Sequence, residues 1–169
     1  TAYVEGILIA NKTYALPSKY NPDMNKAVLN AFYKMQQAAW KDGINLWICS
    51  GFRSYSYQKY LYSSYAARDG KAAADRYSAR PGHSEHQTGL AMDVNNASSS
   101  FEGTKEAKWL AANCSDYGFI IRYPKNKESV TGYKYEPWHI RYLGVKTAKA
   151  VEKSGKCLEE YLGITSKYK

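Results

Sequence analysis

Residues 81–93 read PGHSEHQTGLAMD and contain two of the three histidines of the chain, His83 and His86. His86 and Asp93 are separated by a short segment that crosses Gly89. A glycine permits a tight turn, so both side chains can reach one point. The apolar residues that follow Gly89 favour a short strand with Asp93 near its end. This stretch therefore predicts a loop, a turn and a strand that bring an imidazole and a carboxylate together.

The third histidine, His139, lies in residues 136–142, which read EPWHIRY. Pro137 disfavours regular strand pairing, so we expect Glu136 at the entrance of a strand and His139 within it. Two imidazoles and Asp93 could supply the three protein ligands of a hydrolytic zinc site, and Glu136 could be its separate carboxylate. Taken alone, each motif has a simpler explanation, because His–Asp pairs often form ordinary hydrogen bonds and an isolated ExxH often fills a core.

Residues 50–54, SGFRS, follow an expected buried strand and place Arg53 at its end. A fixed guanidinium binds a carboxylate through two parallel hydrogen bonds. A peptidase that acts at a free C-terminus needs such an anchor. Most arginines are surface or salt-bridged residues, so only the neighbouring motifs give Arg53 this interpretation.

The order of helical and strand patterns indicates an α+β fold with a small, mostly antiparallel sheet, because the chain shows no regular βαβ alternation. We expect one domain over residues 1–169. Asn21 is the expected N-cap of the first helix, with Pro22 at its first position. Ser54 is the expected cap of a later helix whose face includes Tyr57, Leu61 and Tyr65. The expected strands cover residues 6–10, 44–49, 90–94, 119–123 and 135–142, and the expected helices end near residues 43, 68, 78, 117, 153 and 161.

Composition limits the functions that fit. The formal net charge is +9, but the Lys and Arg residues are scattered and no zinc-finger, helix-turn-helix or RRM pattern is present, so we do not expect nucleic-acid binding. An anionic bacterial cell wall would suit the charge equally well, as would an ordinary solvated surface. No apolar run reaches bilayer length, although an anchor upstream of Thr1 is compatible with the sequence. The 17 tyrosines suit surfaces that bind polar ligands.

The three cysteines are Cys49, Cys114 and Cys157, and none forms a CxxC pair. A zinc–thiolate site is therefore not expected. One disulfide with a free thiol and three free thiols both fit the sequence.

Taken together, the three motifs resemble those of the VanY-type D-alanyl-D-alanine carboxypeptidases, zinc peptidases of the hedgehog-like superfamily. SGFRS with Gln58 is similar to the first motif of that family. Residues 84–93 match each fixed letter of its SxHxxGxAxD signature, and EPWH matches its closing ExxH motif. The motifs occur in the order found in the family.

The resemblance implies a role for each residue of the site. His86, Asp93 and His139 would be the zinc ligands and Glu136 the catalytic base. Arg53 would hold the terminal carboxylate of the substrate, and the remaining expected contributors are Ser84 as an assisting group and Gln58 and Trp138 as pocket residues. His83 would be a structural loop residue, and Glu85 would serve packing or hydrogen bonding.

The resemblance also implies a reaction. We expect a zinc-dependent D,D-carboxypeptidase that removes the terminal D-Ala from peptidoglycan stem peptides ending in D-Ala-D-Ala, on the extracytoplasmic side of the bacterial envelope. In the family, that activity can contribute to glycopeptide resistance. One alternative is an L,D-carboxypeptidase acting on tetrapeptide stems. Another is a zinc-containing wall-binding module without turnover, against which the presence of Glu136 argues.

Overall fold

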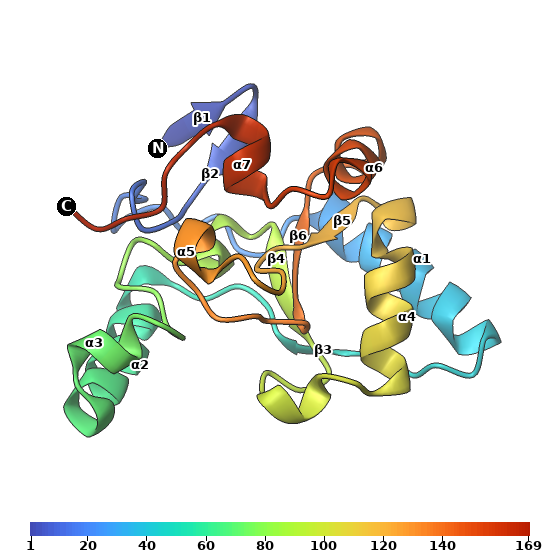
Figure 1. Ribbon diagram of the computed structural model, residues 1–169, viewed down its shortest axis with the longest axis horizontal. Helices are drawn as coiled ribbons and strands as arrows, with labels where there is room; N and C mark the ends of the chain where they lie inside the picture. Colours follow the sequence, from blue (N-terminus) through green and yellow to red (C-terminus); the bar gives the residue numbers. More distant parts are fainter.

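The computed structural model describes all residues, Thr1–Lys169. Its centre is a four-stranded sheet in the order β3-β4-β6-β5, in which every neighbouring pair is antiparallel (Figure 1). A separate antiparallel hairpin is formed by the first two strands. The strands are β1 (Ala2–Val4), β2 (Ile7–Ile9), β3 (Ile48–Ser50), β4 (Ala91–Val94), β5 (Phe119–Ile121) and β6 (His139–Tyr142). The expected α+β class with a small antiparallel sheet is confirmed.

The two central strands divide their residues between a core face and a polar face. Met92 of β4 pairs with Ile140 of β6, and both belong to the main apolar cluster. The next pair along is Asp93 and His139. Because successive strand residues point to opposite faces, this pair lies on the face away from that cluster.

Two helices cover the core face of the sheet. Helix α1 (Lys26–Lys41) buries Val28, Phe32, Met35 and Ala39. Helix α4 (Lys105–Asn113) adds Ala107 and Leu110 to the same cluster. Figure 1 shows both helices together on one side of the sheet.

A second apolar cluster joins the hairpin to the end of the chain. It contains Ile9 of β2, Ile120 of β5 and residues of two C-terminal helices, α6 (Val145–Ser154) and α7 (Leu158–Leu162). In Figure 1, α7 lies beside the hairpin. The C-terminal segment therefore packs against elements near the N-terminus.

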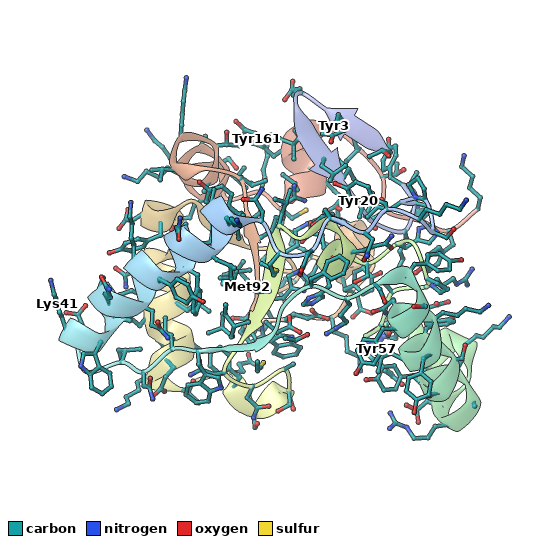
Figure 2. The ribbon with its side chains drawn as sticks, turned by 180° about the vertical axis from the view of Figure 1, so that it is seen from behind. Tyr3, Tyr20, Lys41, Tyr57, Met92 and Tyr161 are labelled. Carbon is teal, nitrogen blue, oxygen red and sulfur yellow. The ribbon has the colours of Figure 1, made fainter.

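The helices α2 (Tyr55–Asp69) and α3 (Lys71–Ala74) lie on the other side of the molecule from α1 and α4 (Figure 1). Ser54 caps α2 by accepting a hydrogen bond from the Tyr57 backbone N–H at 3.2 Å, as expected. The expected face was wrong at Tyr57, which is 51 % exposed, whereas Leu61 and Tyr65 are partly buried. The residues that α2 buries are Gln58 and Tyr62. Figure 2 shows Met92 in the interior and Tyr57 on the α2 unit.

Several helices and strands begin or end at residues other than those expected from the sequence. Helix α1 begins at Lys26, and its cap is Asn25, whose side-chain oxygen accepts from the next two backbone N–H groups. Asn21 and Pro22 precede this start because Asp23 has a φ of 63°, which no helix contains. The expected strand over residues 44–49 begins only at Ile48 and runs to Ser50 as β3, and the strand over 135–142 begins only at His139. Short helices also occur in expected loops, namely η1 (Glu85–Thr88), η2 (Ser99–Phe101) and α5 (Glu128–Thr131). The expected helix that ends near residue 117 consists of α4 followed by the 3-10 helix η3 (Cys114–Tyr117).

All three cysteines are free. Cys49 is exposed, whereas Cys114 and Cys157 are buried. Burial raises the pKa of the Cys114 thiol to about 12, so this group stays protonated near neutral pH. None of the helices combines the length and the apolar character that crossing a membrane requires.

Candidate metal centre

Three short elements bring His86, Asp93 and His139 together. His86 lies in η1, which Ser84 caps by accepting from the His86 backbone N–H at 3.2 Å. Gly89 then reverses the chain with a φ of 71° and leads into β4, which carries Asp93. A Cβ at Gly89 would lie 2.1 Å from the Asp23 carbonyl oxygen, so only glycine fits this turn. The expected turn at Gly89 is confirmed.

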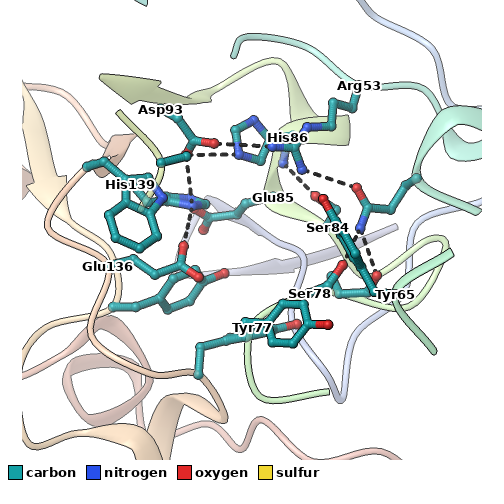
Figure 3. A pocket seen from close by; sticks show the side chains of 16 residues that line it. Arg53, Tyr65, Tyr77, Ser78, Ser84, Glu85, His86, Asp93, Glu136 and His139 are labelled. Carbon is teal, nitrogen blue, oxygen red and sulfur yellow. Dashed lines mark hydrogen bonds and ion pairs between the residues drawn. The ribbon is translucent and has the colours of Figure 1, made fainter. Parts of the chain in front are cut away.

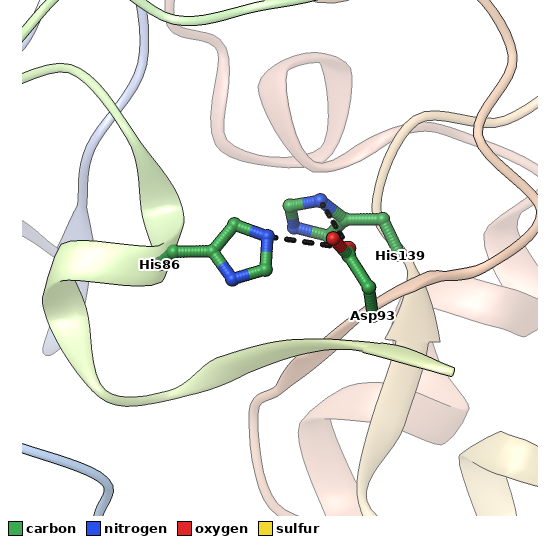
Figure 4. A group of neighbouring side chains, drawn as sticks. All are labelled: His86, Asp93 and His139. Atoms are coloured by element: carbon green, nitrogen blue, oxygen red, sulfur yellow. Dashed lines mark ion pairs between the residues drawn. The ribbon is translucent and has the colours of Figure 1, made fainter. Parts of the chain in front are cut away.

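The three side chains converge on one point (Figure 4). One ligand-type atom from each lies within 4.8 Å of the others, and all three residues are buried. Asp93 Oδ1 is 3.2 Å from His86 Nε2 and 3.6 Å from His139 Nδ1. Asp93 Oδ1, His86 Nε2 and His139 Nδ1 are therefore close enough to contact one ion between them.

The other ring nitrogen of each histidine is held by the protein. His86 Nδ1 lies 2.8 Å from the Gly51 carbonyl oxygen, which can only accept a hydrogen bond, so the proton is on Nδ1. His139 Nε2 lies 3.1 Å from Glu85 Oε1. Each ring thus presents its remaining nitrogen to Asp93, and this support of the far nitrogen is typical of metal-binding histidines.

The arrangement fits a divalent cation. Asp93 Oδ1 is buried and has no hydrogen-bond donor, although a buried carboxylate oxygen normally has one. Its nearest ring nitrogen, His86 Nε2, carries no proton in the neutral ring, so two acceptors face each other with no donor between them. Two imidazole nitrogens and a carboxylate oxygen are a donor set that zinc accepts.

The pKa values in this site reflect burial among acidic groups. Burial lowers the pKa of His86 and favours its neutral ring. Burial also opposes a charge on His139, but hydrogen bonds to Glu136 and Glu85 outweigh it and raise the His139 pKa to about 9. Burial would raise the pKa of Asp93, yet the neighbouring His86 and His139 hold it below its ordinary value. The carboxylates of Glu85, Asp93 and Glu136 therefore favour a positive charge at the position of the His139 ring.

Glu136 lies beside His139 but does not belong to the group of three residues whose ligand-type atoms converge. Its Oε1 is 3.3 Å from His139 Nδ1, and its side chain is 11 % exposed. The segment before β6 holds it, because the Glu136 backbone N–H donates to the Tyr123 carbonyl oxygen at 2.9 Å. Burial raises the pKa of Glu136. Glu136 is thus a partly accessible carboxyl whose proton affinity is increased.

Arg53 reaches the site from the loop after β3. Its Nη2 donates to Asp93 Oδ2 at 3.1 Å, its Nη1 to Gln58 Oε1 at 3.3 Å and its Nε to Ser50 Oγ at 3.1 Å. A guanidinium has five N–H donors, so one N–H on each terminal nitrogen remains. The side chain is 21 % exposed. Arg53 can therefore receive a carboxylate while the protein holds its orientation.

The remaining predicted residues also line the site. Gln58 is buried, and its Nε2 donates to Ser78 Oγ and to the Ala79 carbonyl oxygen. Its Oε1 accepts a hydrogen bond from Arg53 Nη1. Ser84 and Trp138 both line the same pocket. The structure thus brings all the predicted site residues into one place.

That place is a pocket of about 330 Å³. Figure 3 shows Glu136 and His139 on one side and Arg53 on the other, with His86 between them. Tyr65 of α2 and Tyr77 lie across the pocket from His86. Their rings contact edge to face, with centroids 5.4 Å apart. The sequence placed Tyr65 on one face of a helix but assigned neither tyrosine to the site, because local patterns do not reveal which tyrosines face it.

The family model described as VanY, D-alanyl-D-alanine carboxypeptidase, matches residues 21–145. That range contains every site residue described above. The chain belongs to the VanY family. The VanY resemblance of the three sequence motifs is thereby confirmed, and the chain is a carboxypeptidase of that family.

Known proteins agree with the VanY assignment. YodJ of Bacillus subtilis is 42 % identical over 183 residues, which cover 93 % of this chain and 67 % of YodJ. The chain spans 44 % to 67 % of the length of the curated relatives it matches. The solved structure of the LdcB LD-carboxypeptidase is 47 % identical, with a TM-score of 0.87, and the match covers 96 % of this chain and 89 % of LdcB.

A further solved structure carries the metal. It is the vancomycin-resistance D,D-pentapeptidase VanY from a VanB-type cassette, as an E175A mutant in complex with Zn(II). It is 32 % identical, with a TM-score of 0.82, over 92 % of this chain and 97 % of that one. The VanY family therefore includes a zinc-binding member with this fold.

Two residues in the stretch 81–93, His83 and Glu85, are not expected ligands. His83 lies outside the group of ligand-type atoms, where its Nδ1 donates to the Asn11 carbonyl oxygen at 2.8 Å and its ring contacts Tyr168. Glu85, by contrast, touches His139 directly. The sequence showed only that a glutamate precedes His86, because the strand pairing that brings His139 to it is not visible in a local pattern.

Proposed function

We propose that this chain is a zinc-dependent carboxypeptidase that removes the terminal D-alanine from peptidoglycan stem peptides, and that residues 1–169 form its single catalytic domain. The observation that carries the proposal is Asp93 Oδ1, a buried oxygen without a donor that faces His86 Nε2 and His139 Nδ1. Membership of the VanY family supports the same reaction class.

His86, Asp93 and His139 would hold the zinc ion. When bound, zinc would supply Lewis acidity, which lowers the pKa of water and polarises a carbonyl group. The charges favour the ion, because two neutral imidazoles and one carboxylate leave a net charge of about +1. The buried acidic surroundings that raise the pKa of His139 favour a cation for the same reason.

Glu136 would move the proton. The attacking water gives a proton to the Glu136 carboxylate as its oxygen bonds to the carbonyl carbon of the last peptide bond. The C–N bond then breaks, and Glu136 returns the proton to the nitrogen of the departing D-alanine. Burial raises the pKa of Glu136, which makes it a better proton acceptor for this step.

Arg53 would restrict cleavage to the last residue. Its two remaining terminal N–H groups can bind the free carboxylate of the substrate side by side. Gln58 and Ser50 hold the guanidinium in place at 3.3 Å and 3.1 Å. Ser84, whose oxygen already caps η1, can offer its hydroxyl proton to the same carboxylate, and Trp138 forms part of the pocket wall. A substrate without a free C-terminus would lose this orientation.

Two stem peptides are candidates. The sequence motifs led us to expect the D,D reaction, and the D,D-pentapeptidase VanY, at 32 % identity, supports it. The LdcB LD-carboxypeptidase, at 47 % identity, supports the L,D reaction on a tetrapeptide. We favour the L,D reaction on this difference and keep the D,D reaction, with its link to glycopeptide resistance, as the second candidate.

Stem peptides place the activity on the extracytoplasmic side of a bacterial envelope. The net charge of +9 would attract the anionic polymers of that compartment. We propose peptidoglycan stem peptides, and not nucleic acid, as the partner of this surface.

Mass spectrometry of defined stem peptides tests the proposal. The zinc-loaded protein is incubated separately with a tetrapeptide stem and with a pentapeptide stem. Loss of one alanine from the tetrapeptide supports the L,D reaction, and loss from the pentapeptide alone supports the D,D reaction. Intact peptides in both incubations, with zinc shown to be bound, would contradict the proposed function.

A further inference from the structure

Glu85 is buried to 1 % exposure and contacts three cationic or hydrogen-bonding side chains. Its Oε1 lies 3.1 Å from His139 Nε2. Its Oε2 accepts from Arg122 Nε at 2.6 Å and from Arg141 Nη1 at 3.1 Å. One oxygen therefore serves the histidine and the other serves the two arginines.

The arginines are anchored in turn. Arg122 donates through Nη1 and Nη2 to the two carboxylate oxygens of Glu159 in α7, at 2.7 Å and 2.6 Å. Glu159 Oε2 also accepts from Asn11 Nδ2 at 3.0 Å. The two glutamates balance the two arginines in charge, which a buried ionic group requires. The position of Glu85 is thus fixed by Arg122 directly after β5 and by Arg141 of β6, with support from α7 and the N-terminal segment.

We propose that Glu85 is a positioning residue that keeps the proton of the neutral His139 ring on Nε2, so that Nδ1 of that ring can bind the metal. A carboxylate can only accept, and an imidazole that donates from Nε2 offers a lone pair at Nδ1. The inference rests on the proposed function, because it concerns a ligand of the proposed zinc site.

His86 provides the contrast within the same site. Its proton lies on Nδ1 because the Gly51 carbonyl oxygen is 2.8 Å away, so it faces Asp93 with Nε2. The two rings therefore present opposite nitrogens. A backbone carbonyl, which no substitution of a side chain removes, orients His86, whereas His139 depends on Glu85.

A glutamine at position 85 would favour the other tautomer of His139. Its single carbonyl oxygen would turn toward the Arg122 and Arg141 donors, because an amide N–H₂ cannot face them. The amide would then point its N–H toward His139 Nε2 and favour an imidazole protonated on Nδ1. That ring nitrogen is the one that faces Asp93, so metal binding would have to overcome the wrong tautomer.

The test compares Glu85→Gln with Glu159→Gln, measuring zinc affinity by competition with a chelator and folding by urea titration. Glu159→Gln removes the same charge from the same buried cluster but does not touch His139, so it is the matched control. We expect Glu85→Gln to weaken zinc binding about 10- to 100-fold. The control, where folded, should bind zinc nearly as the wild-type protein does. Equal zinc affinity for Glu85→Gln and the wild-type protein would overturn the inference.

A second measurement needs no variant and stands if Glu85→Gln fails to fold. Long-range heteronuclear NMR of the zinc-loaded wild-type protein identifies the protonated nitrogen of each of the three imidazoles. The inference expects His139 to carry its proton on Nε2 and His86 on Nδ1. A proton on Nδ1 of His139 would overturn it. Failure of the wild-type protein to bind zinc would instead contradict the proposed function, so the two failures are distinguishable.

Discussion

Asp93 and His139 are directly opposite each other on the antiparallel strands β4 and β6. The neighbouring pair, Met92 and Ile140, packs into the main apolar cluster. The same four residues therefore build the core on one face and the candidate metal site on the other. A slip of one residue in this register would exchange the two faces, so correct folding of the sheet and assembly of the site are one event.

Glu136→Gln should keep zinc binding and lose turnover. The amide preserves the size of the side chain but cannot accept the proton of water, so kcat should fall by about 10²- to 10⁴-fold. Zinc content and D-alanine release, measured on the same preparation, check this. Glu128→Gln is the matched control, because Glu128 forms an exposed ion pair with Arg76 at 2.8 Å. A rate near that of the wild-type protein in Glu136→Gln would show that the base is another residue.

Arg53→Ala should lower kcat/KM for peptides with a free C-terminus by about 10²-fold or more, because two charge-assisted hydrogen bonds to the carboxylate are lost. Arg53→Lys should recover only part of this loss, since an ammonium lacks the planar pair of donors. Hydrolysis of matched free and C-terminally amidated peptides is the measurement. If both peptides lose activity by the same factor in Arg53→Ala, Arg53 does not anchor the carboxylate.

Gly89→Ala should disrupt the turn between His86 and Asp93. The added Cβ would meet the Asp23 carbonyl oxygen at 2.1 Å, and the φ of 71° is unfavourable for alanine. Gly103→Ala is the control, because Gly103 has a φ of 82° but nothing within 4 Å of an added Cβ. We expect the control to lose about 1–2 kcal/mol of unfolding free energy and Gly89→Ala to lose clearly more. Equal losses in urea titrations would mean that the close approach of Asp23 is unimportant.

The sequence predicted the site better than it predicted the elements around it. Residues 84–93 identify His86 and Asp93 because a histidine, a turn glycine and an aspartate are close along the chain, and capping by Ser54 is likewise a local signal. The start of α1 was misplaced because Asn21 and Asn25 are both good caps. What decides between them is a long-range contact, in which the Asn25 backbone N–H donates to the Gly89 carbonyl oxygen at 3.0 Å.

The buried ionic cluster around Glu85 shows the same limit more strongly. Arg122 and Arg141 each follow apolar strand residues, and nothing nearby in sequence indicates a partner. Only the pairing of β5 with β6 and the packing of α7 bring them to Glu85 and Glu159. Local patterns can therefore name the candidate ligands of this site but not the residues that contact and orient them.

Asp75→Asn should destabilise the protein at neutral pH and much less in acid. Burial would raise the pKa of Asp75, but hydrogen bonds from Arg80 and Tyr62 outweigh it and hold this pKa below its ordinary value. A depressed native pKa stabilises the fold above the unfolded value of about 4, and that stability is lost as pH falls through the native pKa.

We expect a loss of about 1 kcal/mol at neutral pH for Asp75→Asn, kept small because the Arg80 side chain is 39 % exposed. Urea titrations of metal-free wild-type and variant protein at neutral pH and at about pH 3 should show the difference shrinking in acid. A difference that is the same at both pH values would rule out the charge of Asp75 as its source.

The most direct test of the account is the release of alanine from a stem peptide before and after removal of the metal. Zinc is stripped with a chelator, its loss is confirmed by elemental analysis, and the stripped protein is assayed by mass spectrometry with and without added zinc. The account predicts that cleavage of the last residue disappears with the metal and returns with zinc, in proportion to the zinc bound. Full cleavage by the demonstrably metal-free protein would contradict it.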